Sequence, residues 1–368
     1  MKKDWTYKKL GELTKIKTGK LDANASSEDG IYPFFTCSRE PLRISSYSYD
    51  CECVLVAGNG ELNVKYYSGK FDAYQRTYII EALPDSGIMT YYMYHFFNQY
   101  VETLRQKSIG GIIKYIKLGD LTNALIPIPP LSIQRSIVSE LDLLHSVIEK
   151  KQEQLRALDN LAQSLFYQMF GDPITNPMGW QVKKLGEVCD VRDGTHDSPK
   201  YVQYSEYVLI TSKNIVNGEI DFSSCNYITK EDYDSINKRS KVDVGDIIMP
   251  MIGTIGGPII VKETSQKYCI KNVALIKFNI TGVLNVYVKS ILENQSYTEY
   301  LKSLNKGGTQ KFIALGTIRT LTLPLPPLSL QQSFAAKVSA IEAQKQAITQ
   351  SIKDVESLLA QRMDHYFG

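Results

Sequence analysis

The sequence lacks the phosphate-binding motifs of nucleotide-dependent enzymes. Its two Gly-Lys pairs are followed by Leu21 and Phe71, where a phosphate-binding loop requires Ser or Thr, and no G-x-G-x-x-G precedes a predicted helix. The run Gly253–Gly257 is superficially similar to a nucleotide-binding turn. Pro258 and the apolar run Ile259–Val261 that follow it favour a β-hairpin instead.

Other catalytic patterns are missing as well. Amino-methyltransferases carry an Asp/Asn-Pro-Pro-aromatic tetrad. Both Pro-Pro pairs here are preceded by an apolar residue, Ile128 or Leu325, instead of the acid or amide. No Ser-His-Asp arrangement or carboxylate pair is fixed by spacing. His196, in the polar stretch Asp193–Asp197, is the one candidate for a general base, but no nucleophile or metal site accompanies it. A polar contact in a binding loop is the favoured interpretation, and the chain is predicted not to be an enzyme.

Metal ligands, disulfides and membrane segments are scarce. The chain has six cysteines and four histidines; Cys51-Glu52-Cys53 is the one pair that could begin a zinc site, but no second pair follows at ligand spacing. A strand with two reduced thiols is favoured, and no metal is expected. The longest uncharged run, residues 247–261, is too short and too rich in Gly and Pro to span a bilayer, and residues 1–10 lack an apolar signal region. We therefore expect a cytoplasmic protein without a membrane partner.

The remaining composition is that of an ordinary globular protein. Of the 368 residues, 43% are hydrophobic and 22% are charged, and this length favours two domains. The net charge of +3 permits binding to nucleic acid without establishing it.

The chain is a tandem repeat. Trp5–Leu13 matches Trp180–Val188 at an offset of 186 − 11 = 175 residues, and Gly119 matches Gly316 at an offset of 197. The second copy is therefore longer by 197 − 175 = 22 residues, all inserted between the matching ends. A duplicated scaffold whose ends are alike and whose middles differ is typical of two modules with different specificities.

A proline hinge closes each copy. Residues 126–138 read IPIPPLSIQRSIV and residues 323–335 read LPLPPLSLQQSFA. Proline cannot continue a helix, so each hinge predicts a helix start, with Ser132 or Ser329 as the N-cap. Gly171 is predicted to end the first helix. The resulting segments are module 1–131, helix 132–171, module 172–328 and helix 329–368.

Both predicted helices carry an apolar seam with steps of three and four residues, as in a coiled coil. The seam positions are Ile137, Leu141, Leu144, Ile148, Leu155, Leu158, Leu165, Phe334, Val338, Ile341, Ile348, Ile352, Val355 and Leu359. Lys151, Lys345 and Arg362 interrupt the seams. Two matching seams favour an antiparallel pair with the modules at its opposite ends; the alternative is that each helix packs on its own module.

The modules are predicted to be mixed α/β. Apolar β-rich runs and amphipathic segments predict strands at Val54–Ala57, Tyr78–Ile80, Ile247–Met249 and Val273–Ile276, and helices at Tyr91–Leu104 and Val286–Leu304.

The doubled order of module, Pro-Pro-Leu hinge and long helix resembles the specificity (S) subunit of Type I restriction–modification systems. The resemblance is carried by the hinges and by the Lys-Leu-Gly-Glu that opens each module, at Lys9–Glu12 and at Lys184–Glu187. In the second module it is also carried by the runs Asp193–His196, Ile210–Ile215, Gly245–Ile248 and Gly253–Gly256.

The resemblance implies two target-recognition domains (1–131 and 172–328) separated by two long antiparallel coiled-coil helices in a pseudo-twofold repeat. It implies that each domain reads one half of a bipartite double-stranded DNA site, while the helices set the spacer and dock two methyltransferase subunits. These partners bind S-adenosylmethionine and methylate adenine at N6, and two motor-nuclease subunits that use ATP and Mg can join them. The S subunit itself binds no cofactor and catalyses nothing.

Two alternatives stay open at this point. The chain could be a coiled-coil adaptor whose modules bind peptides, and the modest net charge favours this slightly. It could also be a silent copy of an S subunit, with the fold but without active partners.

Candidate DNA contacts follow from the repeat. Residues 71–76 align with residues 267–272 at an offset of 271 − 75 = 196, just before a β-rich run in each module. Arg or Lys suits guanine and Asn or Gln suits adenine, so the predicted base readers are Gln75, Arg76, Lys271 and Asn272. The predicted phosphate contacts, next to Gly-Gly pairs, are Lys114, Lys311 and Gln310. Further candidates are Asn59, Thr195, His196, Lys213, Asn214 and Thr254.

Overall fold

The computed structural model describes residues 5–110, 113–216, 218–252, 256–279, 282–304 and 312–368. They form two compact units: unit 1 comprises residues 1–153 and 349–368, and unit 2 comprises residues 154–348. Each unit therefore contains one predicted module together with parts of both predicted long helices.

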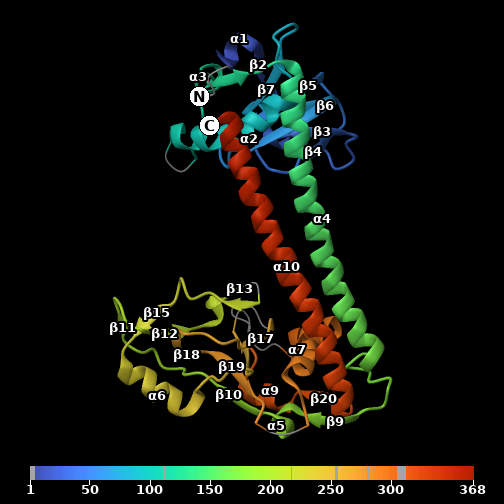
Figure 1. Cartoon of the computed structure of the whole chain (residues 1–368), viewed down its shortest axis with the longest axis vertical. Helices are drawn as coiled ribbons and strands as arrows, with labels where there is room; N and C mark the ends of the chain where they lie inside the picture. The colour runs from blue at the N-terminus through green and yellow to red at the C-terminus, as the bar shows by residue number, and fades with distance from the viewer. Residues whose placement is uncertain (1–4, 111–112, 217, 253–255, 280–281, 305–311) are drawn as a thin grey trace. The chain divides into compact units, whose positions relative to one another are not determined.

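Unit 1 is built on a six-stranded sheet in the order β2-β7-β5-β6-β3-β4, antiparallel except for the pair β3–β6 (Figure 1). The strands are β1 (Thr6–Lys9), β2 (Thr14–Thr18), β3 (Tyr32–Phe35), β4 (Leu42–Ile44), β5 (Tyr49–Ala57), β6 (Val64–Ala73), β7 (Thr77–Ala82) and β8 (Leu125–Ile128). The helices are α1 (Leu10–Leu13), the 3-10 turn η1 (Ala23–Ala25), α2 (Thr90–Lys107) and α3 (Leu118–Thr122). The strands and the helix predicted for this module are confirmed.

Unit 2 contains two four-stranded sheets, β10-β19-β16-β17 and β11-β15-β12-β18, and a small β13–β14 pair. Its strands are β9 (Gln181–Lys184), β10 (Asp190–Asp193), β11 (Tyr201–Val202), β12 (Tyr207–Ile210), β13 (Ile215–Val216), β14 (Glu219–Ile220), β15 (Asn226–Ile228), β16 (Ile247–Pro250), β17 (Ile259–Ile260), β18 (Lys267–Ile270), β19 (Val273–Lys277) and β20 (Thr322–Leu325). Its helices are α5 (Leu185–Val188), η2 (Ser212–Asn214), α6 (Lys230–Ser240), α7 (Asn285–Glu293), α8 (Gln295–Ser303) and α9 (Leu315–Thr320). The antiparallel pairing of β16 with β17 confirms the hairpin predicted around Pro258.

The single helix predicted for Val286–Leu304 is wrong, because Asn294 divides it into α7 and α8. The backbone of Asn294 is extended (ψ 139°), and its side chain accepts a hydrogen bond from the Ser296 amide at 3.1 Å. Asparagine is a preferred N-cap, so this residue starts a new helix where the apolar period alone continues.

The two modules share one strand plan. In unit 1, β6 pairs with β5 along most of its length and then with β3 in parallel; in unit 2, β17 pairs with β16 while the separate strand β18 pairs in parallel with β12. Between β12 and β16 lie β13, β14, β15 and α6, where unit 1 has β4 alone. The additional residues of the second module therefore fall mainly between β12 and β16.

Each proline hinge follows a short two-stranded sheet. β8 pairs with β1 and β20 pairs with β9, so the start and the end of each module lie side by side. The long helices α4 (Leu131–Phe170) and α10 (Leu328–Phe367) begin directly after the prolines. Ser132 thus lies within the first turn, and the predicted Ser N-cap is wrong: the carbonyl of Pro130 accepts the amides of Ile133 and Gln134 at 2.9 and 3.0 Å.

The glutamine of the hinge is a buried link between helix and module. Gln134 has no exposed surface; it accepts a hydrogen bond from the Met89 amide (2.9 Å) and donates to the carbonyls of Gly87 (2.7 Å) and Pro129 (2.9 Å). Gln331 repeats this pattern in unit 2, accepting from the Leu284 amide and donating to the Gly282 and Pro326 carbonyls. The repeated Gln therefore orients each helix on the module that precedes it.

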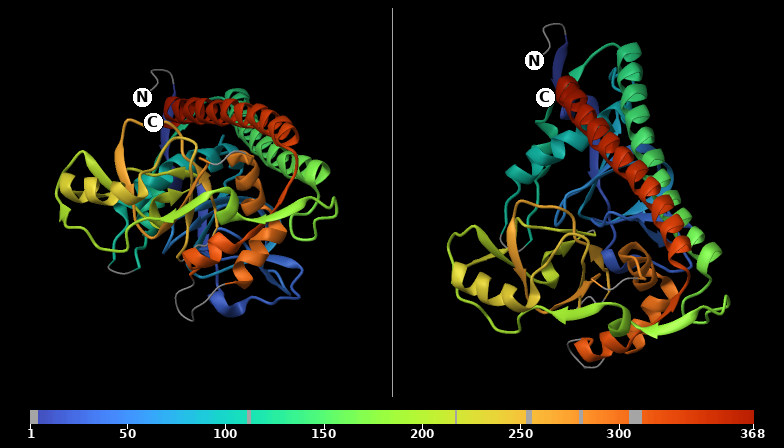
Figure 2. Two further views of the ribbon diagram at one scale, coloured as in Figure 1. Left: turned by 90° about the horizontal axis from the view of Figure 1, so that it is seen from below. Right: turned by 60° about the horizontal axis from the view of Figure 1, so that its bottom comes forward.

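Both seams form the least exposed face of their helices, and the helices run antiparallel within each unit. In unit 1 the buried Ile137 and Leu141 of α4 belong to the module core, on which Leu359 and Met363 of α10 also pack. In unit 2 the last turns of α4 lie beside the first turns of α10 in both views of Figure 2. Within each unit the helices thus pack both on each other and on the module.

Ion pairs occupy two of the three interruptions of the seams. Within unit 2, the Lys345 ammonium lies 2.7 Å from the Asp159 carboxylate and 2.9 Å from that of Glu342. Within unit 1, Arg362 lies 2.7 Å from Glu140. At both positions a cation of α10 pairs with a carboxylate of α4, which restricts the register of the helices.

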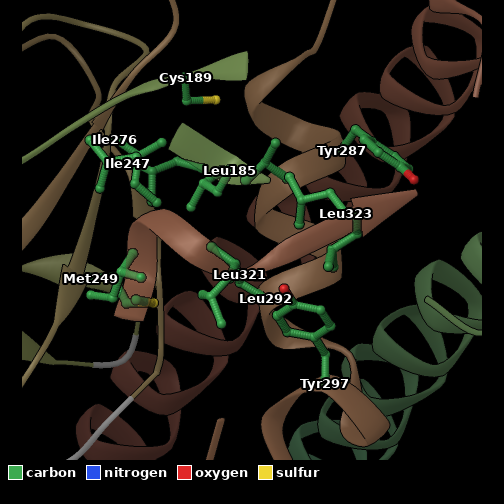
Figure 3. Packing of buried hydrophobic residues seen from close by; sticks show 14 of the residues in the cluster. Leu185, Cys189, Ile247, Met249, Ile276, Tyr287, Leu292, Tyr297, Leu321 and Leu323 are labelled. Carbon is green, nitrogen blue, oxygen red and sulfur yellow. The ribbon is translucent and has the colours of Figure 1, made fainter. Parts of the chain in front are cut away.

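The core of unit 2 combines sheet, helices and both long helices (Figure 3). Tyr287 of α7 and Tyr297 of α8 are fully buried and donate to the carbonyls of Pro324 and Thr322 at 2.7 and 3.0 Å. Phe170, at the end of α4, lies against the Tyr287 ring with centroids 4.8 Å apart. The end of the first repeat's helix is therefore part of the second module's core.

A buried histidine makes the stability of unit 1 sensitive to pH. His95 is 1% exposed and contacts the Asp142 carboxylate at 3.1 Å. Burial lowers its pKa below 6.5 although the Asp142 carboxylate raises it, and nearby His145 lowers it further. The unfolded chain then binds more protons than the folded chain below pH 6.5, so the free energy of unfolding should fall as the pH drops from 7 to 5. The expected loss is about 1.4 kcal/mol per unit of difference between the two pKa values.

Urea unfolding at pH 7 and pH 5 tests this expectation. His95→Gln should reduce the pH dependence, whereas His365→Gln, an exposed position in the same unit, should leave it unchanged. Equal pH dependence in the unaltered chain and His95→Gln would contradict the assignment.

Candidate nucleic-acid interface

The loops that carry the predicted contacts of unit 1 are joined by backbone hydrogen bonds. The amide of Gly58 donates to the carbonyl of Arg76 at 2.8 Å, and the amide of Gly60 donates to that of Lys114 at 2.9 Å. Asn59, between them, is half-buried, while the side chains of Arg76 and Lys114 are exposed. The structure therefore brings a predicted base reader and a predicted phosphate contact to the same edge of the module.

The turn between β6 and β7 holds the other predicted reader of unit 1. Its Gln75 amide donates to the carbonyl of Leu21 at 2.9 Å, and the amide of Tyr74 donates to that of Phe35. The exposed Gln75 side chain donates from Nε2 to Oδ1 of Asp22 at 3.1 Å. Backbone hydrogen bonds thus fix the turn, and one side-chain hydrogen bond fixes the carboxamide group of Gln75.

Unit 2 has the same turn between β18 and β19. The Lys271 amide donates to the Ile210 carbonyl at 2.8 Å and the Asn272 amide to that of Thr195 at 3.2 Å. Asn272 has φ +56°, a conformation that Asn tolerates better than most residues. Gly194 is needed beside it, because a Cβ there would lie 2.3 Å from the Ile270 carbonyl oxygen.

These hydrogen bonds correct the predicted alignment of the two turns. Tyr74 corresponds to Lys271 and Gln75 to Asn272, an offset of 272 − 75 = 197, not 196. Arg76 is then an additional residue in the longer turn of unit 1. The sequence pattern misses this because the offset changes inside a turn whose length differs between modules.

His196 lies between a buried acid and the turn of unit 2. Its Nε2 is 2.7 Å from Oδ2 of Asp193, which is 5% exposed and also paired with Arg239, and its Nδ1 is 2.9 Å from Oδ1 of Asn272. Lys271 donates to the Ser198 hydroxyl at 2.6 Å. The loop after β10 therefore holds both predicted readers of unit 2.

The other predicted contacts of unit 2 have different surroundings. Asn214 is 4% exposed and accepts from the amide and hydroxyl of Thr211, so its side chain holds the turn η2, while Lys213 beside it is exposed. Thr195 is half-buried and its hydroxyl accepts from the Asp197 amide at 3.1 Å. Thr254, Gln310 and Lys311 lie outside the described residues.

Sequence reasoning did not single out Asp22, Arg239 or Tyr115. Tyr115 pairs with Asn59 across an isolated bridge, as Phe312 does with Ile252 in unit 2, and both rings are about two-fifths exposed. The offset of 197 that links Tyr115 to Phe312 is visible in the sequence, whereas nothing local marks Asp22 or Arg239 as partners of residues more than 40 positions away.

The described residues hold no metal-binding cluster, and three of the six thiols are buried. No group of three or more His, Cys, Asp or Glu side chains among these residues is placed to hold a metal ion. The six thiols are unpaired, and burial raises the pKa of Cys189 and of Cys269 to about 12, far from the range of a reactive thiolate. Among the described helices, none has the length and apolar content to cross a membrane.

Comparison with known proteins agrees with this architecture. The family model described as "Type I restriction modification DNA specificity domain" matches residues 2–158 and again residues 177–357. The specificity subunit of the Escherichia coli Type I restriction enzyme EcoDI is 40% identical over 158 residues, which cover 43% of this chain and only 35% of that protein. The MjaVIII specificity subunit of Methanocaldococcus jannaschii is 22% identical over 97% of this chain and 92% of its own length.

Solved structures show the same fold. The S subunit of the Type I restriction–modification system of M. genitalium gives a TM-score of 0.61 at 14% identity, covering 99% of this chain and 96% of that one. A chain from a study of complex assembly in the type I R-M system gives 0.61 at 18% identity, covering 99% and 97%. The family model matches both copies of the repeat, and the two matched segments make up most of the chain. This chain therefore belongs to the family of Type I restriction–modification DNA specificity subunits.

Proposed function

We propose that each module reads one half of a bipartite double-stranded DNA site. The carrying observation is the pair of equivalent turns, β6–β7 and β18–β19, which share their backbone hydrogen bonds but present different side chains. An amide side chain occupies the same place in both, as Gln75 and Asn272, and amides suit base edges in the major groove. One scaffold with different readers is what an asymmetric split site requires.

The proposal extends to partners. The antiparallel helices would set the spacer between the half-sites and dock two methyltransferase subunits, which two motor-nuclease subunits can join. S-adenosylmethionine, ATP and Mg would belong to these partners, and the chain itself would bind DNA without catalysing a reaction.

Methylome sequencing tests the proposal directly. The chain would be expressed with the methyltransferase subunits of its own system in a host that lacks other adenine methylation. A split motif methylated on adenine is expected. A continuous motif would refute reading by two modules, and no motif at all with active methyltransferase subunits would favour the peptide-binding adaptor or a silent copy.

Arg76 and Lys114 should have separable roles. Arg76→Ala should lower discrimination at one position of one half-site by about 1–3 kcal/mol and leave the other half-site intact, because a base contact carries sequence information. Lys114→Ala should weaken binding to all sequences and reduce the slope of affinity against salt concentration. Binding measured by fluorescence anisotropy on matched and mismatched duplexes at several salt concentrations separates the two.

Exposed cations elsewhere in unit 1 serve as controls. Lys15→Ala, at an exposed position on β2, should change neither quantity. Equal loss of affinity on every duplex for Arg76→Ala and Lys114→Ala would contradict the assignment of reader and phosphate contact.

A further inference from the structure

The two reader amides each contact one side chain from the loop that follows the first strand of the module's sheet. Gln75 contacts Asp22, after β2, and Asn272 contacts His196, after β10. The contacting residues differ in chemistry although the turns are equivalent. An amide has a donor end and an acceptor end, so its partner decides which end is left for a base.

In unit 1 the partner fixes the amide of Gln75 in one orientation. A carboxylate can only accept hydrogen bonds, so the Asp22 oxygen must face the NH2 group, as the 3.1 Å contact from Nε2 shows. The oxygen of Gln75 and its second N–H then point away from Asp22. This is the arrangement that reads adenine, by accepting from N6 and donating to N7.

In unit 2 the orientation is the opposite. The acceptor end of Asn272 faces His196: its Oδ1 lies 2.9 Å from Nδ1 of the ring, whose Nε2 lies 2.7 Å from Oδ2 of Asp193. A protonated imidazole donates from both ring nitrogens, which suits these two acceptors. Oδ1 is thereby engaged, and the NH2 group is the end left free. Asn272 would then donate to base acceptors such as N7 and O6 of guanine.

We propose that Asp22 and His196 are positioning residues that determine which base each module accepts, Gln75 presenting its oxygen and Asn272 its NH2 group. The proposal rests on the proposed reading of DNA by these turns. Both contacts lie at the surface, since Asp22 and Gln75 are exposed and the His196 side chain is 60% exposed. They are therefore expected to contribute little to stability, and their effect should appear in specificity.

Asp22→Asn is the decisive substitution. An amide at position 22 can donate or accept, so Gln75 can turn either end toward the base. Discrimination between adenine and guanine at one position of one half-site should fall about tenfold, with the other half-site and the melting temperature unchanged. His196→Ala should relax a single position of the other half-site in the same way.

The readout is methylome sequencing of the complete complex, together with binding competition between duplexes that differ at one base pair. Asp29→Asn and Asp197→Asn, exposed acids nearby, are the matched controls and should retain full discrimination. Two results would overturn the positioning roles alone. One is a split motif in which Asp22→Asn still discriminates adenine from guanine as the unaltered chain does. The other is an equal loss of base discrimination in both half-sites. Absence of a split motif for the unaltered chain would overturn the proposed function itself.

Discussion

Phe334→Ala should destabilise unit 2 by about 3–5 kcal/mol, the range for removing a large buried aromatic side chain. Phe334 is 1% exposed, and its ring lies 5.2 Å from that of Phe170 and 5.8 Å from that of Phe166. The three rings join the start of α10 to the end of α4 inside the module core. A cavity there removes contacts from both helices and from the module, so the surrounding structure has little freedom to close it.

The tryptophans allow each unit to be followed by fluorescence. Trp180 of unit 2 donates from its indole N–H to the Phe170 carbonyl at 3.1 Å, and Trp5 packs against the core of unit 1. Denaturant unfolding of Phe334→Ala in a Trp5→Phe background reports on unit 2 alone. Leu161→Ala, at a 46% exposed position of α4 within unit 2, should cost less than about 1 kcal/mol. A loss of similar size in both variants would show that Phe334 does not close the core.

Gln134→Ala should destabilise unit 1 by about 1–3 kcal/mol, because one substitution leaves three backbone groups, one buried and two partly buried, without their side-chain partner. These are the Met89 amide and the carbonyls of Gly87 and Pro129. Gln134→Glu should be at least as destabilising: the carboxylate still accepts from Met89 but faces two carbonyl oxygens to which it cannot donate. Unfolding followed through Trp5, in a Trp180→Phe background, measures both effects.

The repeat supplies the matched controls. Gln331→Ala should leave the Trp5 transition in place and shift that of Trp180, since its three partners lie in unit 2. Gln152→Ala, an exposed glutamine on α4, should have almost no effect. If each of the Gln134 and Gln331 variants shifted the Trp5 and Trp180 unfolding transitions by the same amount, the hinge glutamines would not stabilise their own units separately.

Much of the scaffold was predictable because its signals are periodic or repeated. The seam from Ile137 to Leu165 has apolar residues at steps of three and four, broken only at Lys151, and α4 places these positions on its least exposed face. The end of α4 at Phe170 follows from Gly171, whose φ of +76° suits glycine. The long helices, the α/β modules and the family follow from patterns of this kind.

The candidate site was predictable only in part. The choice of Gln75 and Asn272 rested on residue type and on their place before a β-rich run, and the structure puts both in equivalent turns. Their exact correspondence was missed, because one additional residue, Arg76, lies within the turn. Their partners Asp22 and His196 are 53 and 76 positions away, and no local pattern records such a contact.

The sequence by itself determined the doubled order of module, hinge and helix, since helix starts, stops and seams depend on neighbouring residues. Only the tertiary structure decided what the hinge glutamines do and which end of each amide is free. Gln134 bonds backbone groups 45 and 47 positions away, and the amides are oriented by side chains from other loops. Hydrogen bonds between distant segments depend on how the chain is folded, so residue order alone does not specify them.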